Sequence, residues 1–125
     1  MCLDYLTEFP ITKNYGYKIF STLNNKLDFL YQDSKTGVKK RRWLVASKGW
    51  LTADFQPKSY KKGFHIYENL SDARMNMIGP FYSAMQPILF RVVFKDVVAV
   101  GREDGMNVIV AKRIFVMEEV KSTST

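Results

Sequence analysis

The residues best suited to bind a ligand gather in one stretch of the chain, Lys35 to Lys62. This stretch holds nine lysines and arginines and a single acid, Asp54, which gives +8, so the remaining residues sum to −1 of the net charge of +7. A field concentrated in this way draws an anionic partner to one face of a protein. Aromatic residues lie between the cations, and aromatic rings stack on nucleobases. The pattern predicts these ligand-binding residues: Lys39, Lys40, Arg41, Arg42, Trp43, Lys48, Trp50, Lys61, Lys62 and His65.

The stretch also has a plainer interpretation. Several cations can contact phosphates, which gives affinity without sequence information, while Trp43 or Trp50 stacks on a base. Equally, the segment can be a solvated charged turn and strand with Trp43 in the core. The one-sided charge keeps both interpretations open.

Two residues are candidates for catalysis. His65 can act as an acid or base or donate a hydrogen bond to a phosphate, with Glu68 close enough in sequence to orient it. It can also simply belong to a partly buried hydrogen-bond network. Cys2 would become an N-terminal nucleophile beside its own amine if Met1 were removed, and otherwise it is a small buried side chain. Because these signals are short, a non-enzymatic protein is the expected class.

The composition argues against metals and cofactors. A single cysteine and a single histidine leave no disulfide and no ordinary zinc ligand set, and the chain has no phosphate-binding glycine loop. We therefore expect no cofactor and no metal. There is no run of about 18 apolar residues and no secretory signal pattern. The expectation is a cytoplasmic protein that does not bind membranes, with an oligomeric state that the sequence does not define.

The strands and the short helix that the sequence pattern indicates predict an α+β fold, which must position these residues. We expect one compact domain over residues 1–125, made mainly of an antiparallel sheet of about six to seven strands with one short helix. Residues 1–12 form an N-terminal arm and residues 121–125 a polar tail. The expected strands are Tyr15–Ser21, Leu27–Tyr31, Lys40–Ser47, Gly63–Tyr67, Ile88–Phe94, Val97–Arg102 and Val108–Glu118.

Turn chemistry separates these elements. Asp104-Gly105 is a strong hairpin signal, and Gly79-Pro80 ends a helix that Asn69 or Ser71 can cap. Lys48–Lys62 lacks periodicity and is expected to be a long loop. Gly63 is expected where two backbones approach closely or where a strand bulges. If the strands on either side of that loop pair, both basic clusters and His65 share one rim.

The chain also resembles a loose group of small proteins from tailed bacteriophages and prophages. The resemblance rests on Met1-Cys2-Leu3, Gly16–Phe20, Tyr60–His65 with Asp72-Ala73, and two pieces of the last hairpin, Val97–Gly101 and Val110–Lys112. It implies an accessory role in the host bacterial cell, such as neutralising host defence. The group has no settled activity, so the resemblance implies no catalytic residues.

Together these observations favour a non-enzymatic phage accessory or counter-defence protein. Its expected partner is anionic, either a nucleic acid or a nucleotide signal, and is bound through the basic and aromatic stretch. An acidic host protein is a third kind of anionic partner that the same stretch could bind. One alternative is an inhibitor that binds a host defence protein directly, through Ile88–Phe94 or Phe81–Met85. The other is a small enzyme that uses His65 with Cys2 or Glu68.

Overall fold

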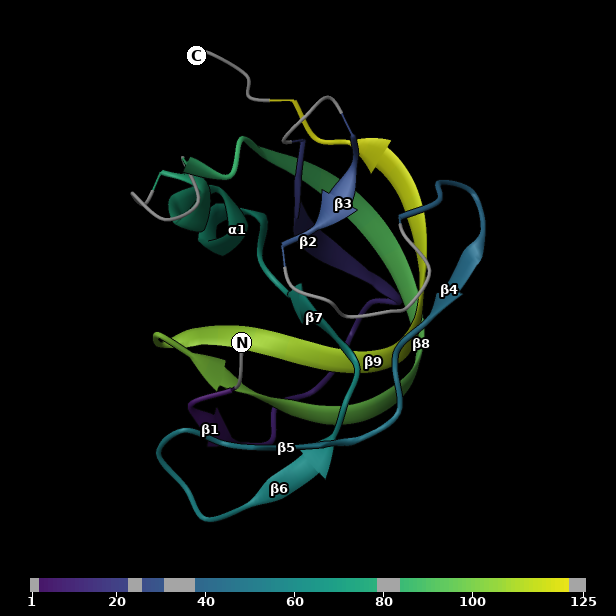
Figure 1. The fold of residues 1–125 in the computed structure, drawn as a ribbon. Helices are drawn as coiled ribbons and strands as arrows, with labels where there is room; N and C mark the ends of the chain where they lie inside the picture. The colour runs from purple at the N-terminus through teal and green to yellow at the C-terminus, as the bar shows by residue number, and fades with distance from the viewer. Residues whose placement is uncertain (1–2, 23–25, 31–37, 79–83, 122–125) are drawn as a thin grey trace.

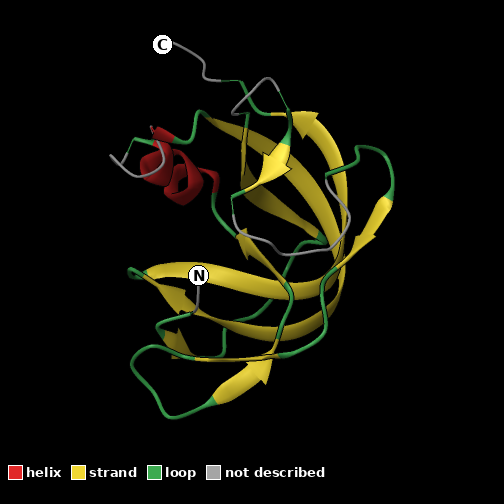
Figure 2. Ribbon diagram, in the orientation of Figure 1, coloured by secondary structure: helices red, strands yellow, loops and turns green. Residues whose placement is uncertain are grey.

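The computed structural model describes residues 3–22, 26–30, 38–78 and 84–121 (Figure 1). In chain order the elements are β1 (Tyr5–Leu6), β2 (Tyr15–Ser21), β3 (Asp28–Phe29), β4 (Trp43–Val45), β5 (Trp50–Thr52), β6 (Ser59–Lys61), β7 (Phe64–Tyr67), α1 (Leu70–Met77), β8 (Pro87–Glu103) and β9 (Met106–Glu119). Seven strands form one antiparallel sheet, and β5 and β6 form a separate pair. Strands dominate, with a single short helix in these ranges (Figure 2). The predicted α+β class is therefore confirmed.

The longest elements, β8 and β9, form one curved hairpin (Figure 1). Its turn is Asp104-Gly105, with φ of 51° and 79°. Two positive φ values are what a two-residue turn between twisted strands requires, so the predicted hairpin is confirmed. The expected break between two strands before Val97 is wrong. Asp96 has a φ of 59° and the register shifts between Val97 and Ala99, so a bulge bends β8 without ending it.

The strand pairings close on themselves. The order is β1-β8-β2-β7-β9-β4, and β8 pairs with β9 as well. The four strands β8, β2, β7 and β9 therefore form a closed ring, in which β2 meets β7 at a single register pair, Tyr17 with Tyr67. The helix α1 packs beside β2, β7 and β8.

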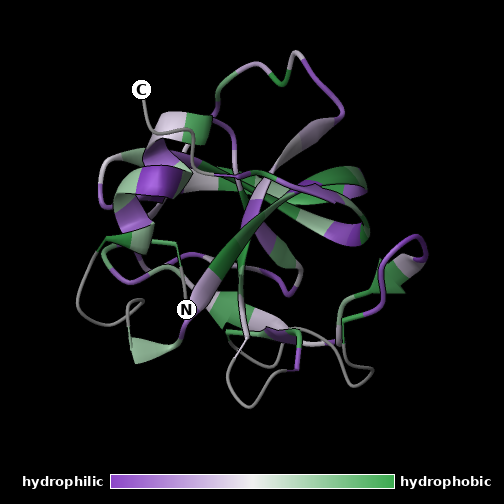
Figure 3. Cartoon of the chain, turned by 90° about the horizontal axis from the view of Figure 1, so that it is seen from above, coloured by the Kyte–Doolittle hydropathy of each residue, from purple (hydrophilic) through white to green (hydrophobic). Residues whose placement is uncertain are grey.

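Both faces of this sheet are buried. Along β2, Phe20 belongs to one hydrophobic cluster and Ile19 to the other, as the alternation of side chains on a strand requires. Aromatic rings fill the first cluster, with Phe20 5.6 Å from Phe90 and Phe29 5.5 Å from Phe64 between centroids. Hydrophobic residues concentrate in the strands (Figure 3). Burial on both faces is consistent with the nearly continuous apolar run of Ile88–Phe94, which only Arg91 interrupts.

Gly63 lies where two backbones meet. A Cβ atom at Gly63 would come within 2.7 Å of the carbonyl oxygen of Ala111 on β9. The expected close approach at this glycine is therefore confirmed. It allows β7 to pair with β9 directly after the segment that carries Lys61 and Lys62.

Several predicted boundaries need correction. The strand expected over Lys40–Ser47 is reduced to β4, because Arg41 has a φ of 61° and interrupts the extended backbone. Of the strand expected over Leu27–Tyr31, only Asp28–Phe29 (β3) is strand among the described residues, and Tyr31 lies outside them. Asn69 occupies the helix N-cap position without a side-chain capping hydrogen bond. Gly79-Pro80 and the tail beyond Lys121 lie outside the described residues.

The largest correction concerns Lys48–Lys62. This segment is not a single loop, because β5 and β6 pair over three residues each. The strands are short, and only one side of the pair faces the core through Leu51 and Tyr60. Three-residue strands are too short to produce a clear period-two pattern.

Candidate functional site

The β5–β6 hairpin presents one aromatic ring and one cation on its outer face. Trp50 and Lys61 are direct cross-strand partners. Trp50 is 65% exposed and Lys61 is also exposed. Thr52 and Ser59 form the next outward pair, with their hydroxyl oxygens 3.4 Å apart. The opposite face of the hairpin is anchored in the core, so the outward side chains have a fixed base.

Two more lysines lie beside this pair. The amide of Lys62 donates a 2.9 Å hydrogen bond to the carbonyl of Gly49, which brings Lys48 and Lys62 to the same end of the hairpin. A Cβ atom at Gly49 would lie 3.1 Å from the side chain of Lys62. We call Lys48, Trp50, Lys61 and Lys62 the hairpin patch. Its three lysines form no ion pair with any residue that the structure describes.

The other predicted basic residues lie at the opposite end of β4. Lys39, Lys40, Arg41 and Arg42 are all exposed, and we call these four with Trp43 the β4 cluster. The amide of Arg41 donates to the carbonyl of Val116, and Lys40 Nζ lies 5.4 Å from the ring centre of Phe90. Lys35 lies outside the described residues.

Trp43 is already in contact with other side chains. The residue is 42% exposed, so the interpretation that places Trp43 in the core is wrong. Lys95 Nζ lies 4.1 Å from the ring centre, and the ring of Phe115 packs edge-on at 5.6 Å. A base that stacks on the ring face next to Lys95 would have to displace that lysine. Of the two tryptophans, Trp50 is therefore the better stacking surface.

The expected pairing of the two basic segments is also wrong. β4 pairs with β9 at Arg113–Phe115 and β7 pairs with β9 at Val108–Ala111, along the edge of β9 that β8 leaves free. The two short strands therefore follow one another along β9. The β4 cluster and the hairpin patch lie at successive positions along this edge and do not face each other.

Two cations of β9 extend the basic surface between these groups. Lys112 Nζ donates a 3.4 Å hydrogen bond to the carbonyl of Ser47. Arg113 pairs with Val45 in the sheet and forms a 3.4 Å ion pair with Asp96. Both lie outside the stretch Lys35 to Lys62 and are therefore not among the predicted ligand-binding residues. The available signal was two adjacent cations inside an otherwise apolar strand.

His65 belongs to a hydrogen-bond network. Its Nε2 lies 3.3 Å from the hydroxyl of Tyr60, which accepts a 2.8 Å hydrogen bond from the amide of Leu3. The buried Lys18 donates from Nζ to the carbonyl of His65 at 2.9 Å. Glu68 accepts a 3.5 Å hydrogen bond from Asn107 Nδ2. This arrangement matches the structural interpretation of His65. Cys2 lies outside the described residues.

The N-terminal arm supports the hairpin, a role that the sequence did not suggest. The carbonyls of Leu3 and Asp4 accept hydrogen bonds of 2.8 and 3.0 Å from the amides of Asp54 and Phe55. The amide of Leu6 donates to Gln56 Oε1 at 2.8 Å. Most of these contacts involve backbone atoms and leave no signature in the residue types.

A buried carboxyl lies where the arm joins the sheet. Glu103, at the end of β8, is 5% exposed, and its Oε1 has no hydrogen-bond partner among the described residues. Burial, with the negative charges of Asp104 and Asp4, raises the pKa of Glu103 to about 7, although Lys18 opposes the shift. Next to Glu103, Arg102 pairs with Tyr5 of β1.

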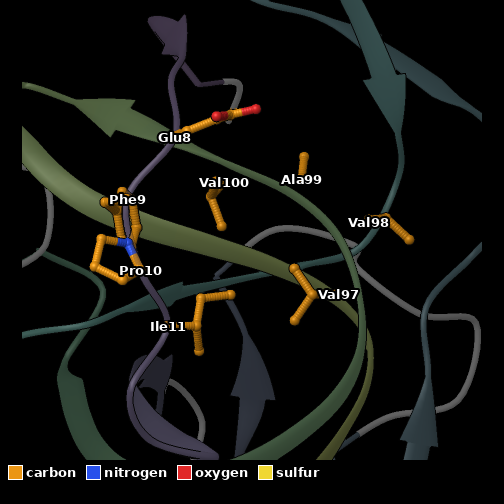
Figure 4. A pocket seen from close by; sticks show the side chains of 8 residues that line it. All are labelled: Glu8, Phe9, Pro10, Ile11, Val97, Val98, Ala99 and Val100. Carbon is orange, nitrogen blue, oxygen red and sulfur yellow. The ribbon is translucent and has the colours of Figure 1, made fainter.

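An apolar groove lies elsewhere, between the arm and the bulge of β8. It has a volume of about 610 Å³ and is lined by Glu8, Phe9, Pro10, Ile11, Val97, Val98, Ala99 and Val100 (Figure 4). Val97 and Ile11 are 40% and 39% exposed. The proposed interface over Ile88–Phe94 is not accessible, because Leu89, Phe90 and Val92 are buried. Residues 81–83 of the other proposed interface lie outside the described residues.

No cluster of three or more His, Cys, Asp or Glu side chains is placed to hold a metal ion within the described ranges. Among the same residues, no helix is long and apolar enough to cross a membrane. Comparisons of the chain with family models, with curated proteins and with solved structures found no match.

Proposed function

We propose that this chain is a non-enzymatic accessory protein that binds an anionic partner, a nucleic acid or a nucleotide, through the hairpin patch. The main support for this proposal is the arrangement around Trp50, which is 65% exposed. Lys61 lies directly opposite Trp50 on β6, and Lys48 and Lys62 lie at the Gly49 end of the hairpin. Phosphates are attracted by such lysines, and bases stack on such a ring. The β4 cluster, with Lys112 and Arg113, extends the same positive edge.

The wider role is proposed from the resemblance to phage proteins. In that setting the protein acts in the cytoplasm of the host bacterium, where it neutralises a host defence by sequestering a nucleic acid or a nucleotide signal. Basic charge suits capture of an anion. His65 Nε2 contacts the hydroxyl of Tyr60, and the carbonyl of His65 accepts a hydrogen bond from Lys18. These structural contacts of His65 favour a binding protein over an enzyme.

Binding measured with the purified full chain tests this proposal. Fluorescence anisotropy with labelled DNA, RNA and a cyclic nucleotide at low and high salt should give affinity that falls steeply with salt. The double variant Lys61→Glu/Lys62→Glu should bind far more weakly. Lys26→Glu is a matched control, because Lys26 is exposed beside β3, at the opposite end of the molecule from β5 and β6 (Figure 1). If no anion binds at low salt, or if the two variants behave alike, the proposal fails.

The apolar groove supports a second candidate function, direct binding of a host defence protein. Its lining is apolar apart from Glu8, and it lies beside residues of β8 that pair with neither β1 nor β2. The exposed Val97 is suited to a protein contact. If Val97→Asp abolishes capture of a host protein while the Lys61→Glu/Lys62→Glu variant retains it, this function replaces the first.

A further inference from the structure

The side chains of the hairpin patch also indicate whether a nucleic-acid partner is single-stranded or double-stranded. A base can stack on a protein ring only when its face is accessible, and in a duplex the neighbouring base pairs cover both faces. Sequence-independent binding of single strands combines cations that follow the backbone with aromatic rings on which bases stack. The question is therefore which aromatic side chain is available.

Trp50 is available. No described ring or cation contacts it, whereas Lys95 and Phe115 contact Trp43. The exposed Phe55, in the turn of the same hairpin, packs its ring 5.7 Å from that of Tyr5. Within the described part of the basic stretch, Trp50 is thus the exposed ring that needs no rearrangement to receive a base.

The lysines of the hairpin patch are placed to contact the phosphates of a nucleic-acid strand. Directly opposed residues of an antiparallel pair have Cβ atoms about 5 Å apart, so Lys61 can reach the phosphate of a nucleotide stacked on Trp50. Lys48 and Lys62 stand together at the Gly49 end and can contact the next phosphate. A three-residue strand is about 10 Å long, so the hairpin patch covers a few nucleotides.

A duplex fits this surface less well. A two-stranded ribbon can enter the major groove, where it reads base edges with hydrogen-bonding side chains. Here the outward face of the ribbon offers the bulky ring of Trp50, the single cation Lys61, and two hydroxyls that lie 3.4 Å from each other. These groups favour stacking over edge recognition.

From this geometry we infer that the ligand is a single-stranded nucleic acid, held with one base stacked on Trp50 and its neighbouring phosphates on Lys48, Lys61 and Lys62. This inference rests on the proposed function, because it identifies the class of anion that the hairpin patch takes. Single-stranded DNA and RNA both offer a base for Trp50 and phosphates for the lysines. They differ in the ribose 2′-hydroxyl, so the test includes one strand of each kind.

The test uses the full chain with the Trp43→Phe substitution, so that Trp50 is the sole tryptophan. Five probes are titrated at low salt: a single-stranded DNA 12-mer, the same 12-mer as RNA, the matching DNA duplex, an abasic 12-mer, and a mononucleotide. The single strands should quench Trp50 fluorescence and bind most tightly. The abasic strand should bind more weakly and cause little quenching.

Substitutions then separate stacking from charge. Trp50→Ala should weaken binding of the single strands by between about fivefold and about a hundredfold, with little effect on the abasic strand. Trp50→Tyr should restore part of the loss, and Phe55→Ala should have little effect. The exposure of Trp50 makes a folding defect in these variants unexpected, and circular dichroism checks it.

Each outcome decides between the two proposals. Preferential, Trp50-dependent binding of single strands supports the inference. Equal affinity for the duplex, for the abasic strand or for the mononucleotide overturns it. In that case a loss of binding in the Lys61→Glu/Lys62→Glu variant still supports the proposed function. Absence of binding to every probe at low salt overturns both.

Discussion

Replacing Glu103 by Gln should remove much of the pH dependence of stability. The pKa of Glu103 is raised from 4.5 to about 7 by burial and by Asp104 and Asp4. The folded protein therefore holds a proton that the unfolded chain releases, and the free energy of unfolding decreases as the pH rises from 4.5 through 7. A difference of 2.5 in pKa, from 4.5 to 7, corresponds to about 3 kcal/mol. Between about 2 and 3 kcal/mol of this falls between pH 5 and pH 8.

Urea unfolding at pH 5 and pH 8 measures the effect, with the parent chain and Glu103→Gln compared at each pH. The parent should lose more free energy of unfolding than the variant between the two values, by between about 2 and 3 kcal/mol. The comparison across pH cancels the constant effect of placing a buried amide at this position. Glu119→Gln, which alters an exposed carboxyl at the end of β9, should keep the parental pH dependence. Equal pH dependence in the parent and in Glu103→Gln would refute the reasoning.

Four further substitutions test the contacts that hold the hairpin and the sheet. Tyr60→Phe removes the hydroxyl that joins the Leu3 amide to His65, and should lower the free energy of unfolding by about 1–2 kcal/mol in denaturant titrations. A loss confined to stability, with His65→Ala leaving nucleic-acid binding intact, would support the structural role of His65. Gly63→Ala should cost about 1–3 kcal/mol, because its Cβ would press on the carbonyl of Ala111. Gly105→Ala meets no atom within 4 Å and should cost only about 1–2 kcal/mol for its positive φ, so a larger loss there than at Gly63 would contradict the argument.

The parts of the fold that could be predicted from the sequence are those with local signals. Asp104-Gly105 specifies its own turn, and the apolar run at Ile88–Phe94 identifies a strand buried on both faces. The β5–β6 hairpin was missed because three-residue strands leave almost no periodic signal. The bulge in β8 was read as a strand end, since Asp96 interrupts the apolar pattern just as a turn residue would.

The candidate site shows the same division. Its residue types could be selected from the sequence, because cations and aromatic residues are concentrated in one stretch. Their grouping could not be predicted, because it depends on where β4 and β7 pair along β9, about 40 to 70 residues further along the chain. Nor could the difference between Trp43 and Trp50 be predicted. It depends on Lys95, which reaches Trp43 from β8.

The support of the hairpin by the N-terminal arm was equally invisible. Leu3 and Asp4 act mainly through their carbonyl oxygens, which every residue has. Contacts of this kind become apparent only when the arm is seen beside the turn of β5 and β6.

The most direct test of the central claim is the slope of log affinity against log salt concentration for a single-stranded oligonucleotide. Contacts of Lys48, Lys61 and Lys62 with three phosphates predict a slope of roughly −2 or steeper, at about −0.7 for each phosphate on a single strand. Lys61→Gln should make the slope shallower by about 0.7, and Lys26→Gln should leave it unchanged. A slope near zero, or the same slope in the parent and Lys61→Gln, would contradict binding of nucleic acid through the hairpin patch.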